Sequence, residues 1–281
     1  MSTAIDPRAA ELRERLRGAL IAAAATPMTA EGQVDLDLVS RYFAGLVADG
    51  ADGLAVLAHT GRGPYLGEDL RTAVIERAVA LGVPVVVGVG GPGDAVRQAK
   101  AAADLGASAL MPFPTTGDRV AEHEAVWEAT GVPLIAFDLY SLPCRPETLE
   151  RVVRLPGVAG LKVALLSDAM GCQRTIALTR AAGRLAITGE DRMFGPSLLW
   201  GAEAALVGLA AARVQVTAAV MRAFRGESLA AFAQASAKLD ELATRTFTEP
   251  MEGYVQRMLW EARAEGRLPA SHAFDLYGPP L

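Results

Sequence analysis

The feature of this sequence that most constrains its fold is a repeated phrase, in which a glycine is followed by a short apolar run. Gly-Ala opens the phrase at residues 50–57, 106–111 and 201–207, and Gly-Val-Pro opens it at 82–87 and 131–136. Because glycine adopts the left-handed conformation that ends many helices, we expect these glycines to follow helices. The apolar runs are typical of strands buried on both faces, as in a parallel sheet.

The chain contains eight runs of this kind, separated by patterns typical of helices. The runs begin near Ala19, Gly53, Val85, Ala109, Leu134, Val158, Leu185 and Ala205, and helical patterns cover residues 38–47, 71–80, 95–105, 122–129, 147–153 and 168–182. Repeats of about 20–35 residues suit successive strand–helix units with right-handed crossovers. We therefore predict an α/β fold, a (β/α)8 TIM barrel, with a doubly wound parallel sheet as the alternative.

The C-terminal part of the chain follows a different pattern. From Val214 onward, apolar residues recur at helical spacing, as at Val220 and Phe224 or at Tyr254 and Met258. We expect residues 1–213 to form the barrel, with a short N-terminal helix. We expect residues 214–281 to form helices of the same domain unit, packed on the barrel or on a neighbouring subunit.

Composition excludes several classes of protein. The 281 residues carry 27 Lys+Arg and 32 Asp+Glu, a net charge of −5, so nucleic acid and anionic membranes are poor partners. Hydrophobic residues make up 51% of the chain, which excludes disorder, and no apolar stretch is long enough to span a membrane. The two cysteines are too few for a disulfide framework, and the charged N-terminus is unlike a secretory signal. We expect a cytoplasmic protein.

Lysine is rare in this chain, and one lysine lies in an unusual place. Only Lys100, Lys162 and Lys238 are lysines among the 27 basic residues, so arginine supplies most of the positive charge. Lys162 falls in the middle of the apolar run 158–166, where burial favours the uncharged amine. A free amine attacks carbonyl groups to form a Schiff base, so Lys162 is the candidate nucleophile. The alternative is a structural ion pair with Asp138 or Asp191.

A second candidate lies after the second predicted strand, where a barrel places active-site loops. The segment 59–63 reads His-Thr-Gly-Arg-Gly. Its backbone N–H groups and the Thr60 hydroxyl could hold a carboxylate, and His59 could act as a general acid or base. We expect His123 and His272 to be solvated. No histidines and carboxylates have metal-ligand spacing, so we expect no metal.

The segment 88–93 matches the dinucleotide-binding pattern G-x-G-x-x-G, but a proline lies inside it. The strand that follows has no acidic residue at its end to bind a ribose. We interpret this segment as a flexible strand-to-helix turn, and we expect no cofactor.

Several motifs together resemble the dihydrodipicolinate synthase/N-acetylneuraminate lyase family of Schiff-base TIM barrels. They are Ala25-Thr26-Pro27, Gly32-Gln33-Val34-Asp35, Gly50-Ala51-Asp52-Gly53-Leu54, Thr60-Gly61, Val87-Gly88-Val89-Gly90-Gly91, Gly160-Leu161-Lys162 and Thr188-Gly189-Glu190-Asp191. The resemblance implies that Lys162 forms a Schiff base with a 2-keto acid, and that Thr60 holds the substrate carboxylate with backbone near Gly61 and Gly189. It also implies a homo-oligomer, a dimer or a tetramer.

The sequence departs from the family pattern at several site positions. Phe137 stands where the family has a proton-relaying tyrosine, and His59 replaces the first threonine of the usual pair. Arg62 replaces a glutamate, and Leu142 replaces the arginine that binds aspartate semialdehyde in the synthases. Phe113-Pro114 replaces a pair of tyrosines. His59 and Tyr140 are then the nearest candidates for moving protons, provided that the loop turns Tyr140 inward.

These observations predict a Schiff-base lyase, an aldolase or dehydratase acting on a 2-keto acid such as pyruvate or a 2-keto-3-deoxy sugar acid. Lys162, His59 and Tyr140 are the expected catalytic residues. Thr60, Gly61, Arg62, Phe137 and Gly189 are the expected substrate-binding residues. One alternative is a 4-hydroxy-tetrahydrodipicolinate synthase of lysine biosynthesis, and another is a barrel that binds a keto acid without turnover.

Overall fold

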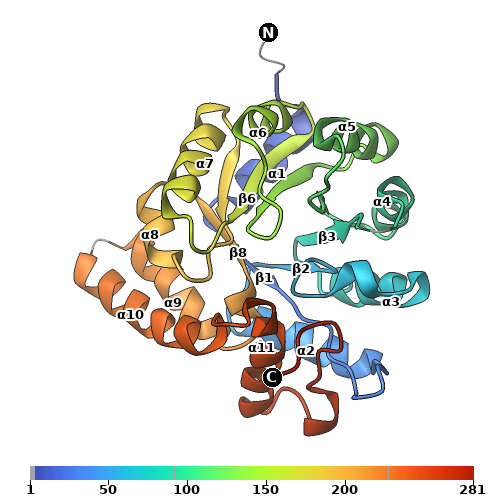
Figure 1. Ribbon diagram of the computed structural model, residues 1–281, viewed down its shortest axis with the longest axis vertical. Helices are drawn as coiled ribbons and strands as arrows, with labels where there is room; N and C mark the ends of the chain where they lie inside the picture. The colour runs from blue at the N-terminus through green and yellow to red at the C-terminus, as the bar shows by residue number, and fades with distance from the viewer. Residues whose placement is uncertain (1–3, 92, 227) are drawn as a thin grey trace.

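A computed structural model describes residues 4–91, 93–226 and 228–281. Eight parallel strands form a closed barrel in which each strand pairs with the next and the last pairs with the first (Figure 1). The strands are β1 (Leu20–Ala23), β2 (Gly53–Val56), β3 (Val85–Val89), β4 (Ala109–Pro112), β5 (Leu134–Leu139), β6 (Val158–Ala164), β7 (Leu185–Thr188) and β8 (Ala204–Val207). The predicted TIM barrel is confirmed, and the doubly wound sheet is wrong because that sheet stays open.

Helices surround the barrel (Figure 1). They are α1 (Pro7–Leu16), α2 (Leu36–Ala48), α3 (Glu68–Val79), α4 (Ala95–Asp104), α5 (Arg119–Thr130), α6 (Pro146–Val153), α7 (Ala169–Ala181), α8 (Phe194–Leu199), α9 (Val214–Arg225), α10 (Leu229–Thr246) and α11 (Tyr254–Ala264). Aspartates begin many of them, since the side chains of Asp35, Asp94, Asp118 and Asp168 each accept a backbone N–H of the first turn.

The glycines of the repeated phrases have the conformation expected of helix ends. Gly50, Gly82, Gly106, Gly131 and Gly201 all have positive φ, between 64° and 109°. A residue with a β-carbon is strained there, so glycine lets the chain leave each helix and enter the next strand. This expectation is therefore confirmed at all five positions.

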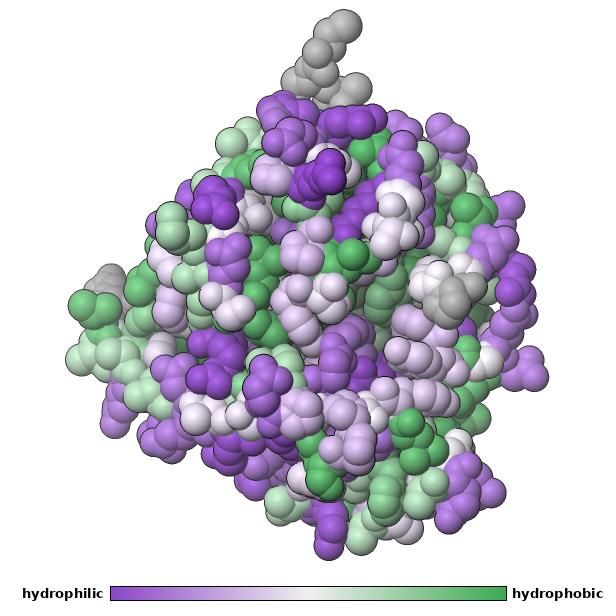
Figure 2. Space-filling view, viewed as in Figure 1, coloured by the Kyte–Doolittle hydropathy of each residue, from purple (hydrophilic) through white to green (hydrophobic). Residues whose placement is uncertain are grey.

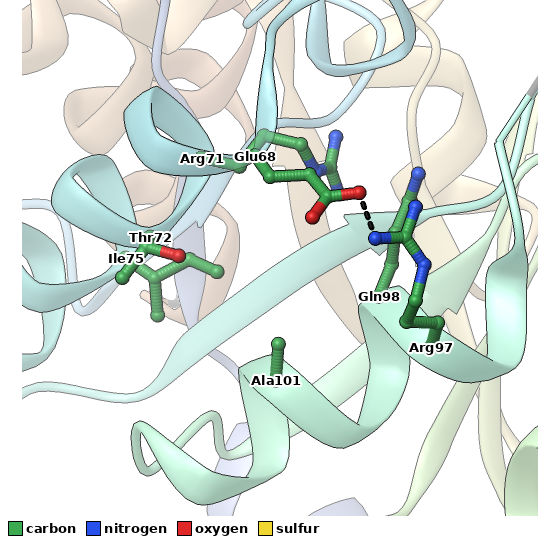
Figure 3. Close-up of a pocket in the computed structure, with 7 residues that line it drawn as sticks. All are labelled: Glu68, Arg71, Thr72, Ile75, Arg97, Gln98 and Ala101. Carbon is green, nitrogen blue, oxygen red and sulfur yellow. Dashed lines mark ion pairs between the residues drawn. The ribbon is translucent and has the colours of Figure 1, made fainter.

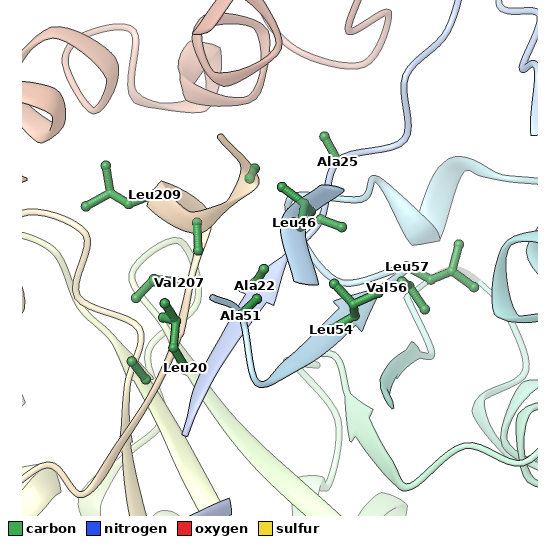
Figure 4. Close-up of a cluster of buried hydrophobic side chains, with 14 of the residues drawn as sticks. Leu20, Ala22, Ala25, Leu46, Ala51, Leu54, Val56, Leu57, Val207 and Leu209 are labelled. Carbon is green, nitrogen blue, oxygen red and sulfur yellow. The ribbon is translucent and has the colours of Figure 1, made fainter. Parts of the chain in front are cut away.

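Two apolar layers hold the barrel together. The outward-facing side chains of the strands pack against the helices, as Leu20, Leu54 and Val207 do near Leu46 of α2 (Figure 4). The inward-facing side chains form a second cluster, which helix α1 joins through Ala9, Leu12 and Leu16. Because α1 contacts this interior cluster, it closes one end of the barrel, and the substrate site lies at the other.

A bulge in β6 decides which way its side chains point. Leu134 of β5 pairs with Val158, but the next residue, Ile135, pairs with Gly160, so Ala159 is an extra residue. Val158 packs among the outward-facing residues, whereas Ala164 packs in the interior cluster. Side chains alternate between the two faces of a regular strand, so Val158 and Lys162 would share a face. The one-residue insertion between them puts Val158 outside and Lys162 inside.

The C-terminal part of the chain packs against the barrel at several places. Helices α9 and α10 contact each other, and α9 and α11 contact the short 3₁₀ helix 208–211 that follows β8. Beyond α11, Arg267 forms an ion pair with Asp49, and Phe274 donates its backbone N–H to Met28. Figure 1 shows this final segment beside α2. Figure 2 shows hydrophilic and hydrophobic residues interspersed over the same face.

One histidine expectation is wrong. His123 of α5 is 3% exposed, and its Nδ1 lies 2.6 Å from the carbonyl oxygen of Arg119. Burial lowers the pKa of His123 to about 4, which the Arg119 carbonyl opposes and the Arg119 guanidinium reinforces. The helical pattern around this position did not reveal that His123 faces inward.

Candidate active site

Lys162 lies at the interior of the barrel, near the carboxyl end of β6. It is 5% exposed, and its Nζ lies 4.3 Å from the centroid of the Phe137 ring on the neighbouring strand β5. No carboxylate of the described residues lies within ion-pair distance of Nζ. The structural pairing with Asp138 or Asp191 that the sequence left open is therefore not formed.

The electrostatic surroundings favour the neutral amine of Lys162. Burial lowers its pKa, while the nearby Asp191 and Glu190 oppose that shift. Burial also raises the pKa of Asp191 and of Glu190, the latter to about 7. Both carboxyl groups are bound by backbone: Glu190 accepts the N–H groups of Leu165 and Leu166, and Asp191 accepts that of Leu209.

Gly189 is the neighbour that leaves room for the Lys162 side chain. A β-carbon on Gly189 would lie 2.6 Å from Lys162 Cε and 2.8 Å from the carbonyl oxygen of Val163. Both distances are shorter than any van der Waals contact, so a larger residue would displace the lysine stem or the strand. Glycine at this position is therefore required for the packing of the Lys162 side chain.

A small cavity of about 20 Å³ lies over the lysine. Its lining comes from the loops after the strands and from the C-terminal segment: His59, Thr60, Phe137, Leu139, Tyr140, Lys162, Ala164, Leu166, Gly189, Asp191, Gly208, Phe247 and Tyr254. Tyr140 and Leu166 also line a larger hollow of about 520 Å³, together with Ser167, Arg192, Met193, Glu249 and Met251. The lysine cavity and the larger hollow are thus neighbours that share Tyr140 and Leu166 in their walls.

The loop after β2 is held in a tight, strained conformation. Leu57 and Arg62 have φ of 55° and 54°, which is unfavourable for residues with a β-carbon. A β-carbon on Gly61 would lie 2.9 Å from the backbone nitrogen of Leu57, and Thr26 donates its hydroxyl to the carbonyl of Gly61 at 2.8 Å. This packing presents His59 and Thr60 to the cavity.

The C-terminal segment supplies a second wall of the site. Tyr254, the first residue of α11, is 4% exposed, and its hydroxyl lies 3.1 Å from His59 Nδ1 and 3.0 Å from Thr60 Oγ1. Its ring stacks on His59 at 5.9 Å and on Phe247 at 4.5 Å between centroids. Glu252, in the 3₁₀ helix Met251–Gly253, places Oε1 3.3 Å from His59 Nε2.

Tyr140 turns inward, as its expected role requires. It lines the cavity with Lys162, its ring lies edge-on to His59 at 6.1 Å, and its hydroxyl donates to Glu252 Oε1. Burial opposes ionisation of Glu252, but hydrogen bonds from His59, Tyr140 and Arg62 lower the pKa of its carboxyl to about 2. Glu252 is therefore ionised at neutral pH.

Arg62 lies outside the cavity lining, against expectation. Its guanidinium donates to Asp275 at 2.7 Å, to Glu252 Oε2 at 3.0 Å and to the Glu252 carbonyl at 2.8 Å. These contacts bind its N–H groups to the C-terminal segment instead of a substrate. Arg62 thus attaches residues 252 and 275 to the loop after β2.

Sequence reasoning missed the contribution of the C-terminal segment. In the sequence, Tyr254 fits the apolar stripe of a helix, and nothing there singles out Glu252, Phe247 or Asp275. No motif marks Glu252, Tyr254 or Asp275, because they contact residues that lie 190 or more positions away along the chain. The only available signal was a tyrosine and a glutamate at the start of a helix.

The remaining sequence candidates lie elsewhere. Gly88 packs on the Leu57 carbonyl, and Gly90 and Gly91 have positive φ. The glycine-rich turn therefore serves backbone packing. Pro92 of this segment lies outside the described residues. Another pocket, between α3 and α4, contains an ion pair of Glu68 with Arg97 and shares no lining residue with the Lys162 cavity (Figure 3). Across the described residues, no group of three metal-ligating side chains occurs.

The described helices include none with the length and hydrophobicity needed to cross a membrane.

Residues 16–270 match the sequence model of the dihydrodipicolinate synthetase family. The 4-hydroxy-tetrahydrodipicolinate synthase of Anaeromyxobacter dehalogenans (strain 2CP-C) is 30% identical over 278 residues, covering 91% of each chain. That of Synechococcus sp. (strain WH7803) is 35% identical over 213 residues, covering 69% of this chain and 68% of the relative.

Solved structures share the fold. The chloride-inhibited dihydrodipicolinate synthase from Acinetobacter baumannii, complexed with pyruvate, superposes with a TM-score of 0.82 at 21% identity and covers 95% of this chain and 94% of its own. N-acetylneuraminate lyase from Mycoplasma synoviae gives 0.77 at 17% identity, with 95% and 93% covered. From its sequence match over residues 16–270, this chain belongs to the dihydrodipicolinate synthetase family.

Proposed function

We propose that this enzyme is a Schiff-base lyase that cleaves or dehydrates a 2-keto acid, with Lys162 as the nucleophile. The observation that carries the proposal is the burial of the Lys162 amine beside Phe137, where it lines a small cavity. An amine whose pKa is lowered by burial is in its nucleophilic form for a larger fraction of the time. Membership of the family supports the same chemistry.

The reaction begins when the Lys162 amine attacks the keto carbon. A carbon–nitrogen bond forms, and the keto oxygen leaves as water after taking one proton from the amine and one from a general acid. The resulting protonated imine draws electrons from the adjacent carbon. The Thr60 hydroxyl, at the cavity wall, binds the substrate carboxylate, with backbone groups near Gly61 and Gly189. Phe137 keeps water from the imine, and His59 accepts or returns protons as bonds break and form.

The wider hollow supports a substrate longer than pyruvate. It shares Tyr140 and Leu166 with the cavity that contains Lys162, and its lining includes Ser167, Arg192 and Glu249. Hydroxyl, guanidinium and carboxylate groups together suit a chain that carries several hydroxyl groups. A 2-keto-3-deoxy sugar acid has such a chain beyond its keto group.

Reductive trapping tests the nucleophile. The protein is incubated with pyruvate and with 2-keto-3-deoxy sugar acids, reduced with borohydride, digested and analysed by mass spectrometry. We expect the adduct on the peptide that contains Lys162, with the exposed Lys100 and Lys238 as internal controls in the same digest. A Lys162→Met variant should give none. Absence of an adduct at Lys162 from every keto acid in the panel would contradict the proposal.

A second candidate is 4-hydroxy-tetrahydrodipicolinate synthase, because curated relatives at 30–35% identity carry that name. The departure at Leu142 favours the lyase, since a leucine cannot bind the carboxylate that the arginine of the synthases binds. A coupled assay with pyruvate and aspartate semialdehyde decides between them. Trapping of Lys162 without turnover of any keto acid would instead identify a binding protein without catalysis.

We further propose that the protein acts in the cytoplasm as a homo-oligomer. Two free cysteines, Cys144 and Cys172, are compatible with a reducing compartment. Large apolar side chains are exposed on the outer helices, among them Met170 and Leu199. Cell fractionation tests the location, and light scattering of the purified protein measures the number of subunits.

A further inference from the structure

The hydroxyl of Tyr254 lies at the centre of a hydrogen-bonded chain beside the cavity. It contacts His59 Nδ1 at 3.1 Å, and His59 Nε2 contacts Glu252 Oε1 at 3.3 Å. Carboxylate, imidazole and hydroxyl thus follow one another in the order found where an imidazole activates a hydroxyl group. Two of the three residues come from the C-terminal segment, and only His59 comes from a loop of the barrel.

The protons of this chain can be assigned from the groups themselves. The Glu252 carboxylate can only accept hydrogen bonds, so a neutral His59 carries its proton on Nε2 and leaves Nδ1 as an acceptor. The Tyr254 hydroxyl then donates to His59 Nδ1, and in the substrate-free site it accepts from the Thr60 hydroxyl at 3.0 Å. When Thr60 donates its proton to a bound substrate carboxylate instead, Tyr254 keeps its bond to His59. One lone pair of the Tyr254 oxygen is left over, and Tyr254 lines the same small cavity as Lys162.

Glu252 is held in place for this role by two further donors. Arg62 Nη1 donates to its Oε2 at 3.0 Å, and the Tyr140 hydroxyl donates to its Oε1. Arg62 also donates to the Glu252 carbonyl, so both the side chain and the backbone of this residue are fixed. The Tyr140 hydroxyl is committed to Glu252, which leaves the Tyr254 hydroxyl with the direct contact to the imidazole.

We propose that Tyr254 is the catalytic hydroxyl of this enzyme, activated by His59, with Glu252 as the positioning residue. The inference rests on the proposed Schiff base at Lys162. The Tyr254 oxygen takes a proton from the substrate carbon next to the imine, as its own proton passes to His59 Nδ1. The electron pair of the broken carbon–hydrogen bond forms the enamine and neutralises the imine nitrogen. The positive charge moves to the imidazolium, against the Glu252 carboxylate.

The arrangement explains how the barrel works without a tyrosine on β5. Phe137 occupies the position beside Lys162 on that strand and has no hydroxyl. Tyr254, at the start of α11, supplies a hydroxyl to the same cavity from the C-terminal segment. The reaction needs a group that accepts and returns a proton within the dry cavity, and the hydrogen-bonded chain from Tyr254 to Glu252 provides it.

The test separates imine formation from proton transfer. Wild-type protein and the variants Tyr254→Phe, His59→Asn and Glu252→Gln are each assayed with pyruvate for borohydride trapping and for exchange of the methyl protons with deuterated solvent. We expect Tyr254→Phe to retain trapping within about threefold and to lose exchange by about 10²–10⁴-fold. His59→Asn should lose exchange by a similar factor, and Glu252→Gln by about tenfold or more.

The matched control is Tyr42→Phe, which removes another buried tyrosine hydroxyl, one that donates to the Ala211 carbonyl outside the cavity. It should retain both trapping and exchange. Exchange at the wild-type rate in Tyr254→Phe would overturn the assignment of Tyr254. Absence of a borohydride adduct in wild-type protein would instead overturn the Schiff base at Lys162. Failure of the Tyr254 assignment and failure of the Schiff base are therefore distinguishable. Circular dichroism checks that each variant folds.

Discussion

At the scale of single residues, the position of the Lys162 side chain depends on a neighbour that has no side chain. Gly189 lies against the stem of Lys162, and a β-carbon there would come within 2.6 Å of Cε. The stem of Lys162 thus packs against Gly189, while its amine lies over the Phe137 ring and the side chain lines the cavity. Small residues near a nucleophile can thus be as necessary as the polar ones.

We expect Gly189→Ala to slow trapping of pyruvate at Lys162 by about tenfold or more, because the methyl group displaces the lysine stem. The same overpacking should lower the free energy of unfolding by about 1–3 kcal/mol. Trapping rates and urea denaturation measure the two effects. Gly67→Ala is the control, since a β-carbon at Gly67 meets no atom within 4 Å. Equal trapping rates in the two variants would contradict this prediction.

At the scale of secondary-structure elements, the outer helices contain groups that make folding depend on pH. His123 of α5 is buried, and its Nε2 has no hydrogen-bond partner. In the unfolded chain a histidine takes up a proton near pH 6.5, whereas burial lowers the pKa of His123 in the folded protein to about 4. Acid therefore favours the unfolded state, and stability falls as the pH decreases from about 6.5 to 4.

We expect the unfolding free energy of wild type relative to His123→Gln to fall by about 2 kcal/mol between pH 7.5 and 4.5, because glutamine does not titrate. Glu190, whose pKa burial raises to about 7, titrates in the same range but is common to both proteins and cancels in the difference. Urea denaturation at several pH values gives the comparison. A difference independent of pH would show that His123 is accessible to protons in the folded state.

The β6 strand shows how a local irregularity controls function. The residues 158–164 are a continuous apolar run apart from Lys162, so the pattern predicts a strand but not which residues face inward. The extra residue at Ala159 changes the alternation and turns Lys162 toward the barrel interior. A bulge of this kind depends on pairing with β5, and therefore on structure that forms far from the residue itself.

At the scale of the whole molecule, the C-terminal segment is fixed to the barrel by a buried ion pair. The side chains of Arg62 and Asp275 are 4% and 1% exposed, and they form two or more hydrogen bonds. Arg62 also binds Glu252, so the same guanidinium connects the end of the chain to the residues around the cavity. This connection couples the stability of the C-terminal segment to the geometry of the site.

We expect Asp275→Asn to lower the free energy of unfolding by about 2–4 kcal/mol, since it leaves part of a buried positive charge unpaired. Turnover should fall by about tenfold as Glu252 and Tyr254 lose their fixed positions. The control is Glu68→Gln, which breaks the exposed pair with Arg97 shown in Figure 3 and should cost less than about 1 kcal/mol. If both substitutions had the same effect on turnover, the Arg62–Asp275 pair would have no special role.

The sequence by itself determined the barrel, because its evidence is local and repeated. Glycines that end helices, aspartates that begin them and apolar runs of strand length all act within a few residues of one another, and the structure has the eight strands they predict. The same local evidence identified Lys162, since an amine in an apolar strand is unusual wherever the strand lies.

Only the tertiary structure decided what surrounds that lysine. The bulge at Ala159 turned it inward, the loop after β2 used Arg62 to bind the C-terminal segment, and Tyr254 reached His59 from 195 residues away. The contacts of the C-terminal segment form only when it packs on the barrel, and they produce no periodic pattern in the sequence. Hydrogen bonds and ion pairs depend on distance in space, whereas sequence patterns record only distance along the chain.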